Sequence, residues 1–220
     1  MSESPASTFG WLGGRGTRRA ALARAGIVAA GLGMAWPAMG GRQIEEPLSH
    51  AVRTALSAAV SGSAPPEPVF SSIDERQAHA QWLATCSARL ARFQPHPVER
   101  QEFLQTLWYE ARRAGLSLSL VLGLVQVESG FRKYAVSSAG ALGYMQVMPF
   151  WARLIGDGDE SRLFHMQTNL RFGCVILRYL LDREGGDAFM GLGRYNGSRG
   201  QAAYPNAVMA AQRQWRHGLD

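Results

Sequence analysis

One apolar segment in the middle of the chain constrains the fold more than any other feature. Between Leu118 and Val127 the sequence is almost continuously apolar, so its side chains would cover most of a helix circumference. A helix of this kind lies inside a domain rather than on its surface. Glu128 follows directly, and Gly130 stands where a left-handed residue would end the helix. We therefore expect Glu128 in the last turn of a buried helix.

The position of Glu128 predicts acid–base chemistry. Burial disfavours the carboxylate anion, and the negative end of the helix dipole disfavours it further, so both effects raise the pKa of Glu128. A carboxyl group that stays protonated near neutral pH can donate a proton to a leaving group. The next acidic residue along the chain is Asp157. The local sequence therefore offers one carboxyl group and favours a single-carboxylate mechanism over a two-carboxylate one.

The remaining chain predicts more helices and almost no sheet. Apolar residues recur at helical spacing in residues 72–93, 97–114 and 169–183. The first of these segments begins with Ser72 and Glu75 at the spacing of a capping box. No alternating strand pattern of useful length occurs. We predict a mainly α fold with at most a small β-hairpin near residues 141–147.

The first part of the chain reads as an export segment followed by a linker. Residues 1–41 contain a basic region that ends at Arg24, then an apolar run and small residues, which predicts an export signal peptide. An uncleaved N-terminal anchor is the alternative, although the apolar run is shorter than the ~20 residues of a membrane-spanning helix. Residues 42–72 are rich in Ala, Ser, Gly and Pro, which predicts a flexible linker.

The second part of the chain contains the presumed catalytic unit. Residues 73–96 predict an N-terminal packing helix, and residues 97–220 predict one catalytic domain. A chain of 220 residues with 46% hydrophobic content can bury one sizeable core. We expect a monomer.

A dense motif begins at Glu128 and gives the chain a family resemblance. Its positions are Glu128, Ser129, Gly130, Phe131, Ala135, Ser137, Gly140, Ala141, Gly143, Met145, Gln146, Met148 and Pro149. This pattern resembles the signature of the soluble lytic transglycosylases, family 1. Tyr195-Asn196-Gly197 and the Tyr204-x-x-x-Val208 spacing resemble the second block of that family, and Asn169 with Gly173 resembles its intermediate helix. The resemblance covers about residues 100–215.

The resemblance implies a fold, a reaction and a set of site residues. It implies a lysozyme-like SLT domain that cleaves the MurNAc-β-1,4-GlcNAc bond of peptidoglycan and closes a 1,6-anhydromuramyl ring. Glu128 would protonate the glycosidic oxygen and then, as a carboxylate, take the proton of the muramyl 6-hydroxyl. The predicted substrate-binding residues are Ser137, Gly143, Gln146, Met148, Tyr195 and Asn196.

Individual roles also follow from the resemblance. Ser137 matches a serine that hydrogen-bonds near the catalytic carboxylate, and Tyr195 matches a tyrosine whose hydroxyl helps to orient it. Gly143, Gln146 and Met148 match residues of the sugar groove, whereas Met148 can equally be a core residue. Asn196 is better explained as a helix-end cap than as a sugar ligand. Tyr144 stands where the family usually has leucine, and we expect this to change the shape of the groove.

Cysteine and histidine spacing predicts no metal site, and we expect no cofactor. Cys86 and Cys174 are far apart, so we interpret them as two buried thiols, or as a disulfide between two helices if the chain is exported. The acidic segment 157–160 alternates potential calcium ligands, but it lacks the glycine that an EF-hand loop needs at its sixth position. We expect a solvated acidic turn.

Charge and layout bear on partners and location. The net charge is +6, but the basic residues neither cluster nor interleave with aromatic residues, so we predict peptidoglycan strands and no nucleic acid as partners. We expect a periplasmic protein, with a specialised role in opening the wall for a secretion, conjugation or pilus apparatus. Two alternatives remain. A hydrolytic muramidase would need a second carboxylate from Asp157, Asp159 or Asp187, and an inactive scaffold would only bind glycan.

Overall fold

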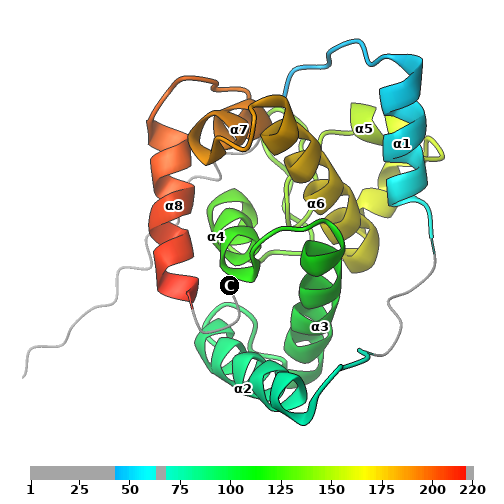
Figure 1. Cartoon of the computed structure of the whole chain (residues 1–220). Coiled ribbons are helices and arrows are strands. Elements are labelled where there is room, and N and C mark those ends of the chain that lie inside the picture. The colour runs from blue at the N-terminus through cyan, green and yellow to red at the C-terminus, as the bar shows by residue number, and fades with distance from the viewer. Residues whose placement is uncertain (1–42, 63–67, 217–220) are drawn as a thin grey trace, which may run out of the picture. The chain divides into compact units, whose positions relative to one another are not determined.

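The described part of the chain folds into helices. The structure is a computed structural model that describes residues 43–62 and 68–216. The predicted export signal, residues 1–41, lies outside these residues. The helices in the described part are α1 (His50–Val60), α2 (Ile73–Leu90), α3 (Pro97–Arg113), α4 (Leu118–Ser129), α5 (Phe150–Ile155), the short 3₁₀ helix η1 (Glu160–Phe164), α6 (Met166–Arg183), α7 (Ala188–Asn196) and α8 (Ala203–Trp215) (Figure 1). This confirms the predicted mainly α fold.

Helix α4 lies at the centre of the bundle, with α3, α6, α7 and α8 around it (Figure 1). All of its residues from Leu118 to Val125 are buried, as the continuous apolar pattern predicted. Its most extensive packing is against α8. Gly123 makes this approach possible, because a Cβ atom there would lie 2.6 Å from the backbone nitrogen of Gln212. The helix that ends at Glu128 is therefore the core of the fold.

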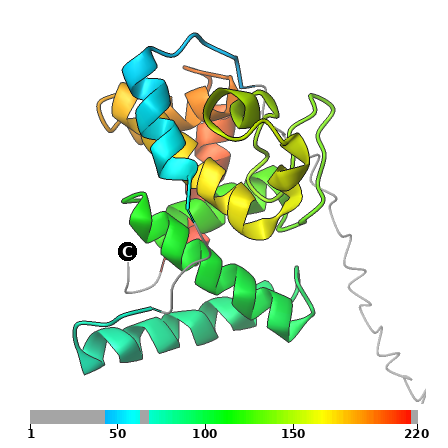
Figure 2. The same ribbon diagram turned by 90° about the vertical axis from the view of Figure 1, so that its right-hand side faces the viewer.

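Helices α2 and α3 close one end of the bundle (Figure 2). Ser72 caps α2 by accepting a hydrogen bond from the Glu75 amide at 3.1 Å. The Glu75 carboxylate accepts from the amide of Ser71, at 2.9 Å, so the capping box closes one residue earlier than its usual form. Trp82 and Leu90 are among the buried residues of α2, which packs against α3.

Residues 43–62 correct one prediction, and we call them the N-terminal strap. The flexible linker predicted for residues 42–72 is wrong in this part, because the strap contains α1 and contacts α5 and α6 (Figure 1). Leu56 and Val60 of α1 are buried. At the start of the strap, Gln43 is buried too, and its Oε1 accepts a hydrogen bond from Trp151 Nε1 at 2.8 Å. Tertiary packing therefore orders an Ala/Ser-rich segment.

Two arginines hold the end of the strap by hydrogen bonds to its backbone carbonyl groups. Arg113 Nη2 donates to the Ala59 carbonyl at 2.5 Å, and Arg171 Nη1 donates to the Gly62 carbonyl at 2.7 Å. Cations near a helix C-terminus also interact favourably with the helix dipole. These bonds attach the end of α1 to α3 and α6.

The loop between α4 and α5 contains the only strand-like pairing among the described residues. Val136 pairs with Leu142, and Leu142 pairs with Val147, as isolated antiparallel bridges. This matches the prediction of at most a small hairpin near residues 141–147. The loop places most of the motif residues close to the end of α4.

Other predictions concern thiols, metals and membranes. Cys86 and Cys174 are both buried thiols. Burial raises the pKa of the Cys174 thiol well above its usual range, so it is protonated. Within residues 43–62 and 68–216, no group of three or more His, Cys, Asp or Glu side chains is placed to hold a metal ion. In the same residues, no helix is long and apolar enough to cross a membrane.

Candidate active site

The candidate site is built on the last turn of α4. Glu128 lies there as predicted, and its side chain is fully buried. Gly130 ends the helix in the left-handed conformation, with a φ of 57°. Ser129 is buried beside it, and its hydroxyl donates back to the Val125 carbonyl at 3.1 Å. The helix end thus places a carboxyl group inside the protein.

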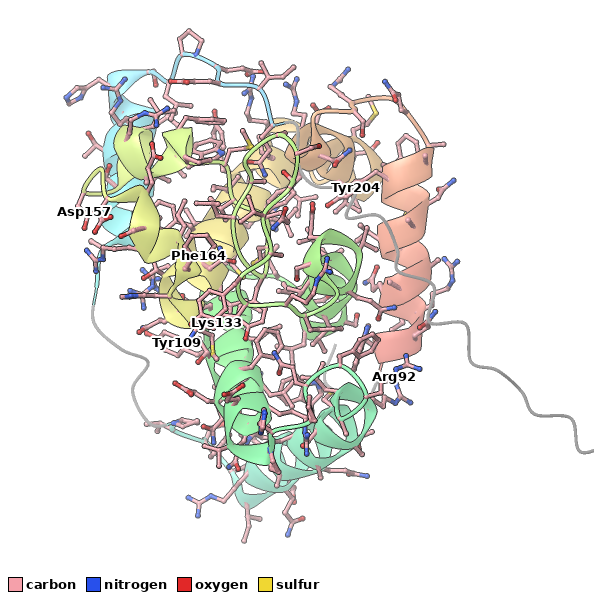
Figure 3. The ribbon with its side chains drawn as sticks, turned by 180° about the vertical axis from the view of Figure 1, so that it is seen from behind. Arg92, Tyr109, Lys133, Asp157, Phe164 and Tyr204 are labelled. Atoms are coloured by element: carbon pink, nitrogen blue, oxygen red, sulfur yellow. The ribbon has the colours of Figure 1, made fainter. Side chains whose placement is uncertain are left out.

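A tyrosine from α8 holds this carboxyl group. The Tyr204 hydroxyl donates a hydrogen bond to Glu128 Oε1 at 2.5 Å. Tyr204 is buried at the start of α8, on the side of that helix that faces the interior (Figure 3). Burial, and then the nearby Glu128, raise the pKa of Tyr204 well above its usual value. The hydroxyl therefore stays protonated and acts as the donor.

Tyr195 lies close to the same carboxyl group but makes a different bond. Its hydroxyl donates to the Met145 carbonyl at 2.8 Å. Burial raises the pKa of Tyr195, and the nearby Glu128 raises it further. The structure therefore gives the direct contact with Glu128 to Tyr204, where the resemblance placed Tyr195. The sequence analysis quoted Tyr204 only as part of a spacing, although a buried tyrosine hydroxyl generally needs a partner.

Asn169 of α6 fastens the loop that lies over the site. Its Oδ1 accepts from the Met145 amide at 2.8 Å, and its Nδ2 donates to the carbonyls of Leu142 and Leu163, each at 2.8 Å. The side chain is buried, so these three bonds satisfy its main polar capacity. The motif gave Asn169 no role, and the structure shows that it positions the loop.

Gly143 is required by this arrangement. It has a φ of 74°, and a Cβ atom there would clash with the Asn169 amide and lie 2.8 Å from the Leu163 carbonyl. The groups that come close to Gly143 are therefore the protein's own, Asn169 of α6 and Leu163 of η1. Contact of Gly143 with a sugar stays a prediction.

Gln146 is buried in the same loop with a strained backbone. Its φ is 49°, which is uncommon for a residue other than glycine. Its Nε2 donates to the carbonyls of Ala135 and Gly143, at 3.1 and 2.9 Å. Its Oε1 accepts no hydrogen bond from the described residues. The donor group of Gln146 therefore shapes the loop, and contact of Gln146 with a sugar stays a prediction.

The other predicted substrate-binding residues have local contacts. Ser137 accepts from the Ala141 amide at 3.0 Å and closes a turn. Met148 is half-buried against the core. Asn196 is the last residue of α7, before the left-handed Gly197, and its Nδ2 donates to Ser198 Oγ at 2.9 Å. Contact of Ser137, Met148 and Asn196 with substrate stays a prediction.

The charges around the site differ in how they are compensated. Two carboxyl groups of the described residues are buried, Glu110 and Glu128. Glu110 forms an ion pair with the buried Arg171, at 2.8 Å, and contacts Arg113 as well. Glu128 instead has a neutral tyrosine as its hydrogen-bond donor. The two buried carboxyl groups thus differ in the donor that the structure shows for each, a guanidinium for Glu110 and a phenol hydroxyl for Glu128.

The aspartates that a two-carboxylate mechanism would need are exposed and locally engaged. Asp157 forms an ion pair with Arg162, and its Oδ1 accepts from the amide of Asp159. Asp159 caps η1, and Asp187 caps α7 by accepting from the Met190 amide at 3.0 Å. The 157–160 segment is thus the solvated acidic turn that the sequence predicted.

A helical domain built around a buried α4 carboxyl group is the architecture expected of the resemblance, and a family comparison agrees. Residues 106–216 match the model of the transglycosylase SLT domain family. The chain therefore belongs to the SLT domain family. The match begins within α3 and covers α4 to α8, and α2 lies outside it.

Curated relatives match the same part of the chain. Membrane-bound lytic murein transglycosylase C of Actinobacillus pleuropneumoniae is 38% identical over 93 residues, which cover 39% of this chain and 26% of the relative. The protein of the same name from Mannheimia succiniciproducens is 44% identical over 88 residues, which cover 36% of this chain and 25% of the relative. The matched segments are thus about a quarter of the length of these relatives.

One solved structure is also similar. It is an inactive mutant of the lytic transglycosylase Slt from Pseudomonas aeruginosa, which is 22% identical and has a TM-score of 0.41. The similarity covers 64% of this chain and 27% of that chain.

Proposed function

We propose that the chain is a peptidoglycan lytic transglycosylase that cleaves the MurNAc-β-1,4-GlcNAc bond and forms 1,6-anhydromuramyl products. Membership of the SLT domain family and the names of the relatives support this reaction class. The observation that carries the proposal is the fully buried Glu128 with its hydrogen bond from Tyr204. This arrangement provides one group that can serve as acid and then as base.

The proposed mechanism uses Glu128 twice. As a neutral acid it protonates the glycosidic oxygen, so the bond to the anomeric carbon breaks and the GlcNAc side leaves as an alcohol. The substrate's N-acetyl group or the electrostatics of the site carries the positive charge at the anomeric carbon. The Glu128 carboxylate then takes the proton of the muramyl 6-hydroxyl, whose oxygen attacks that carbon. The proton count of the enzyme is restored, and no water is consumed.

The surroundings of Glu128 suit both halves of this cycle. Burial favours the neutral acid, and the hydrogen bond from Tyr204 favours the anion. Because Tyr204 is buried and donates to Oε1, it also fixes the orientation of the carboxyl group while the proton is transferred at the other oxygen.

Hydrolysis is the alternative within the same class of substrate. It would need a second carboxylate to activate water, and Asp157, Asp159 and Asp187 each have a local partner in an exposed turn or cap. This supports ring closure over hydrolysis.

The proposal extends to location and biological role. The relatives are named membrane-bound murein enzymes, which supports action in the cell envelope, and we propose the periplasm. We also propose a specialised role in opening the wall for a secretion, conjugation or pilus apparatus. A deletion strain in which all such structures assemble normally would contradict that role.

Mass spectrometry of muropeptides tests the reaction. Purified sacculi are incubated with the wild-type chain, with Glu128→Gln, and with Glu102→Gln as a control at an exposed glutamate of α3. We expect anhydromuramyl products, each lighter by one water molecule than its hydrolytic counterpart, from the wild type and the control only. Reducing muramyl ends would establish a hydrolase instead. Binding to sacculi without release would favour the glycan-binding alternative.

A further inference from the structure

A buried glutamine outside the matched family segment contacts the loop that follows Glu128. Gln94 lies in the connection between α2 and α3 and is buried. Its Nε2 donates to the Phe131 carbonyl at 3.2 Å and to the Tyr144 hydroxyl at 3.1 Å. Phe131 is the third residue after Glu128, and Tyr144 lies near the far end of the same loop. One amide group therefore joins the two ends of the loop.

The loop needs such a restraint because its ends are strained. Phe131 and Gln146 are the residues other than glycine with a positive φ among those described, at 64° and 49°. Such conformations persist only where the surroundings hold them. The Phe131 ring packs against Phe93 and Trp215, and its carbonyl is held by Gln94. The side chain and the backbone of Phe131 are thus fixed separately.

Gln94 is itself held firmly. The backbone amide of Gln94 donates to the Leu90 carbonyl at 2.9 Å, and the backbone carbonyl of Gln94 accepts from Arg100 Nη1 at 2.7 Å. The orientation of the side-chain amide follows from chemistry, since the Phe131 carbonyl can only accept and so must face the NH₂ group. The Gln94 Oε1 has no hydrogen-bond partner among the described residues. The restraint on the loop therefore depends on the donor group alone.

Tyr144 completes the arrangement and explains a departure from the family pattern. It stands where the family usually has leucine, and we expected it to reshape the groove. The structure buries Tyr144 against Phe103 of α3, with a ring-centroid distance of 4.8 Å, and points its hydroxyl at Gln94. The hydroxyl gives Gln94 its second acceptor, and the effect of Tyr144 on the shape of the groove stays a prediction.

We propose that Gln94 is a positioning residue for the reaction, which holds the loop of residues 130–146 and through it the end of α4 that carries Glu128. Gln94 acts through Phe131 and Tyr144 and touches no reacting atom. The inference rests on the proposed function for its effect on turnover. It makes the α2–α3 connection, which lies before the matched residues 106–216, part of the catalytic unit.

Steady-state kinetics of four variants tests this proposal. We expect Gln94→Leu to lower kcat about tenfold and to change KM less than about twofold, because the substrate contacts remain while the alignment of Glu128 is lost. Tyr144→Phe should lower kcat about threefold, and the double variant should be no slower than Gln94→Leu, because Gln94→Leu already removes the bond to the Tyr144 hydroxyl. Leu83→Ala, a partly buried α2 residue, is the control for general destabilisation and should keep kcat.

The outcomes separate this proposal from the proposed reaction. Wild-type kcat in Gln94→Leu, or an equal loss in Leu83→Ala, would overturn the positioning role. Hydrogen exchange needs no activity, so it decides the matter even if the wild type releases no product. The amides of Gly143 and Gln146, which bond to the Ala135 and Gly143 carbonyls, should exchange faster in Gln94→Leu than in Leu83→Ala. Equal exchange in the two variants would contradict the restraint.

Discussion

At Glu128, a tyrosine hydroxyl helps to hold a buried carboxyl group. Two tyrosines lie close to it, but only the Tyr204 hydroxyl has a hydrogen bond to Glu128, whereas the Tyr195 hydroxyl bonds to the Met145 carbonyl. A bond to a charged acceptor contributes more than a bond to a neutral carbonyl. The two tyrosines are therefore expected to differ in what they contribute to turnover.

This difference gives a prediction for two matched substitutions. Tyr204→Phe removes the donor to Glu128 and should lower kcat about 10- to 100-fold, the effect of losing about 1.5–3 kcal/mol at a charged group. Tyr195→Phe should cost about 1 kcal/mol of unfolding free energy and lower kcat much less. Turnover on sacculi and thermal unfolding measure the two effects. Equal losses of kcat would show that the hydrogen bond to Glu128 has no special part in the reaction.

Sequence reasoning succeeded at Glu128 and failed at its partner for a physical reason. The end of α4 is set by local signals, an apolar helix followed by Gly130, so it was predictable. The contact between Tyr204 and Glu128 joins residues 76 apart in the sequence, and nothing local distinguishes Tyr204 from Tyr195. The same limit applies to Gln94, whose acceptors are 37 and 50 residues away.

Among the elements, α1 shows how packing overrides composition. An isolated helix of 11 residues is marginal in water, and an Ala/Ser-rich sequence with a proline-rich neighbour resembles a linker. A signal was nevertheless present, because Val52, Leu56 and Val60 recur every four residues and Ser49 precedes them as an N-cap. The bonds from Arg113 and Arg171 to its last carbonyls could not be read from this pattern.

The buried ion pair between Glu110 of α3 and Arg171 of α6 gives a prediction about stability. Glu110→Gln leaves the Arg171 guanidinium buried without its counter-charge, and removing one partner of a buried pair costs about 3–5 kcal/mol. We expect the unfolding free energy to fall by that amount. Glu102→Gln, on the exposed face of the same helix, should change it by less than about 0.5 kcal/mol.

Denaturant unfolding of both variants measures the effect, with the double variant Glu110→Leu/Arg171→Leu as a further control. The double variant should be more stable than Glu110→Gln, because no charge is left buried. If Glu110→Gln is as stable as Glu102→Gln, the pair does not anchor α3 to α6.

At the scale of the whole molecule, surface ion pairs predict the response to acid. Hydrogen bonds from Arg199 and then Arg194 lower the pKa of Glu184 to about 2, and a hydrogen bond from Arg183 lowers the pKa of Glu46 of the strap. Both groups have an ordinary value of 4.5. Their folded-state pKa lies below the unfolded one, so their contribution to stability is present above about pH 4.5 and is lost as the pH falls toward 2.

The expected result is a fall in the midpoint of thermal unfolding between about pH 4.5 and pH 2. Glu184→Gln should flatten this dependence, because the variant has no group to titrate at that position. Glu45→Gln, at an exposed strap residue, is the control and should leave the wild-type slope unchanged. The same slope in wild type and Glu184→Gln would show that the pairs with Arg194 and Arg199 do not couple to unfolding.

The strap also fixes an order of events during synthesis. Gln43 bonds to a residue 108 positions later, and Glu46 bonds to Arg194, 148 positions later. At about 5–20 residues per second, the ribosome needs roughly 7 to 30 s to make that last partner after the strap itself. Leu56 and Val60 lie on α1, whose partners α5 and α6 are also made only later. The strap is therefore made early but can complete its packing only late. We expect its apolar face to be exposed to chaperones and proteases in the meantime.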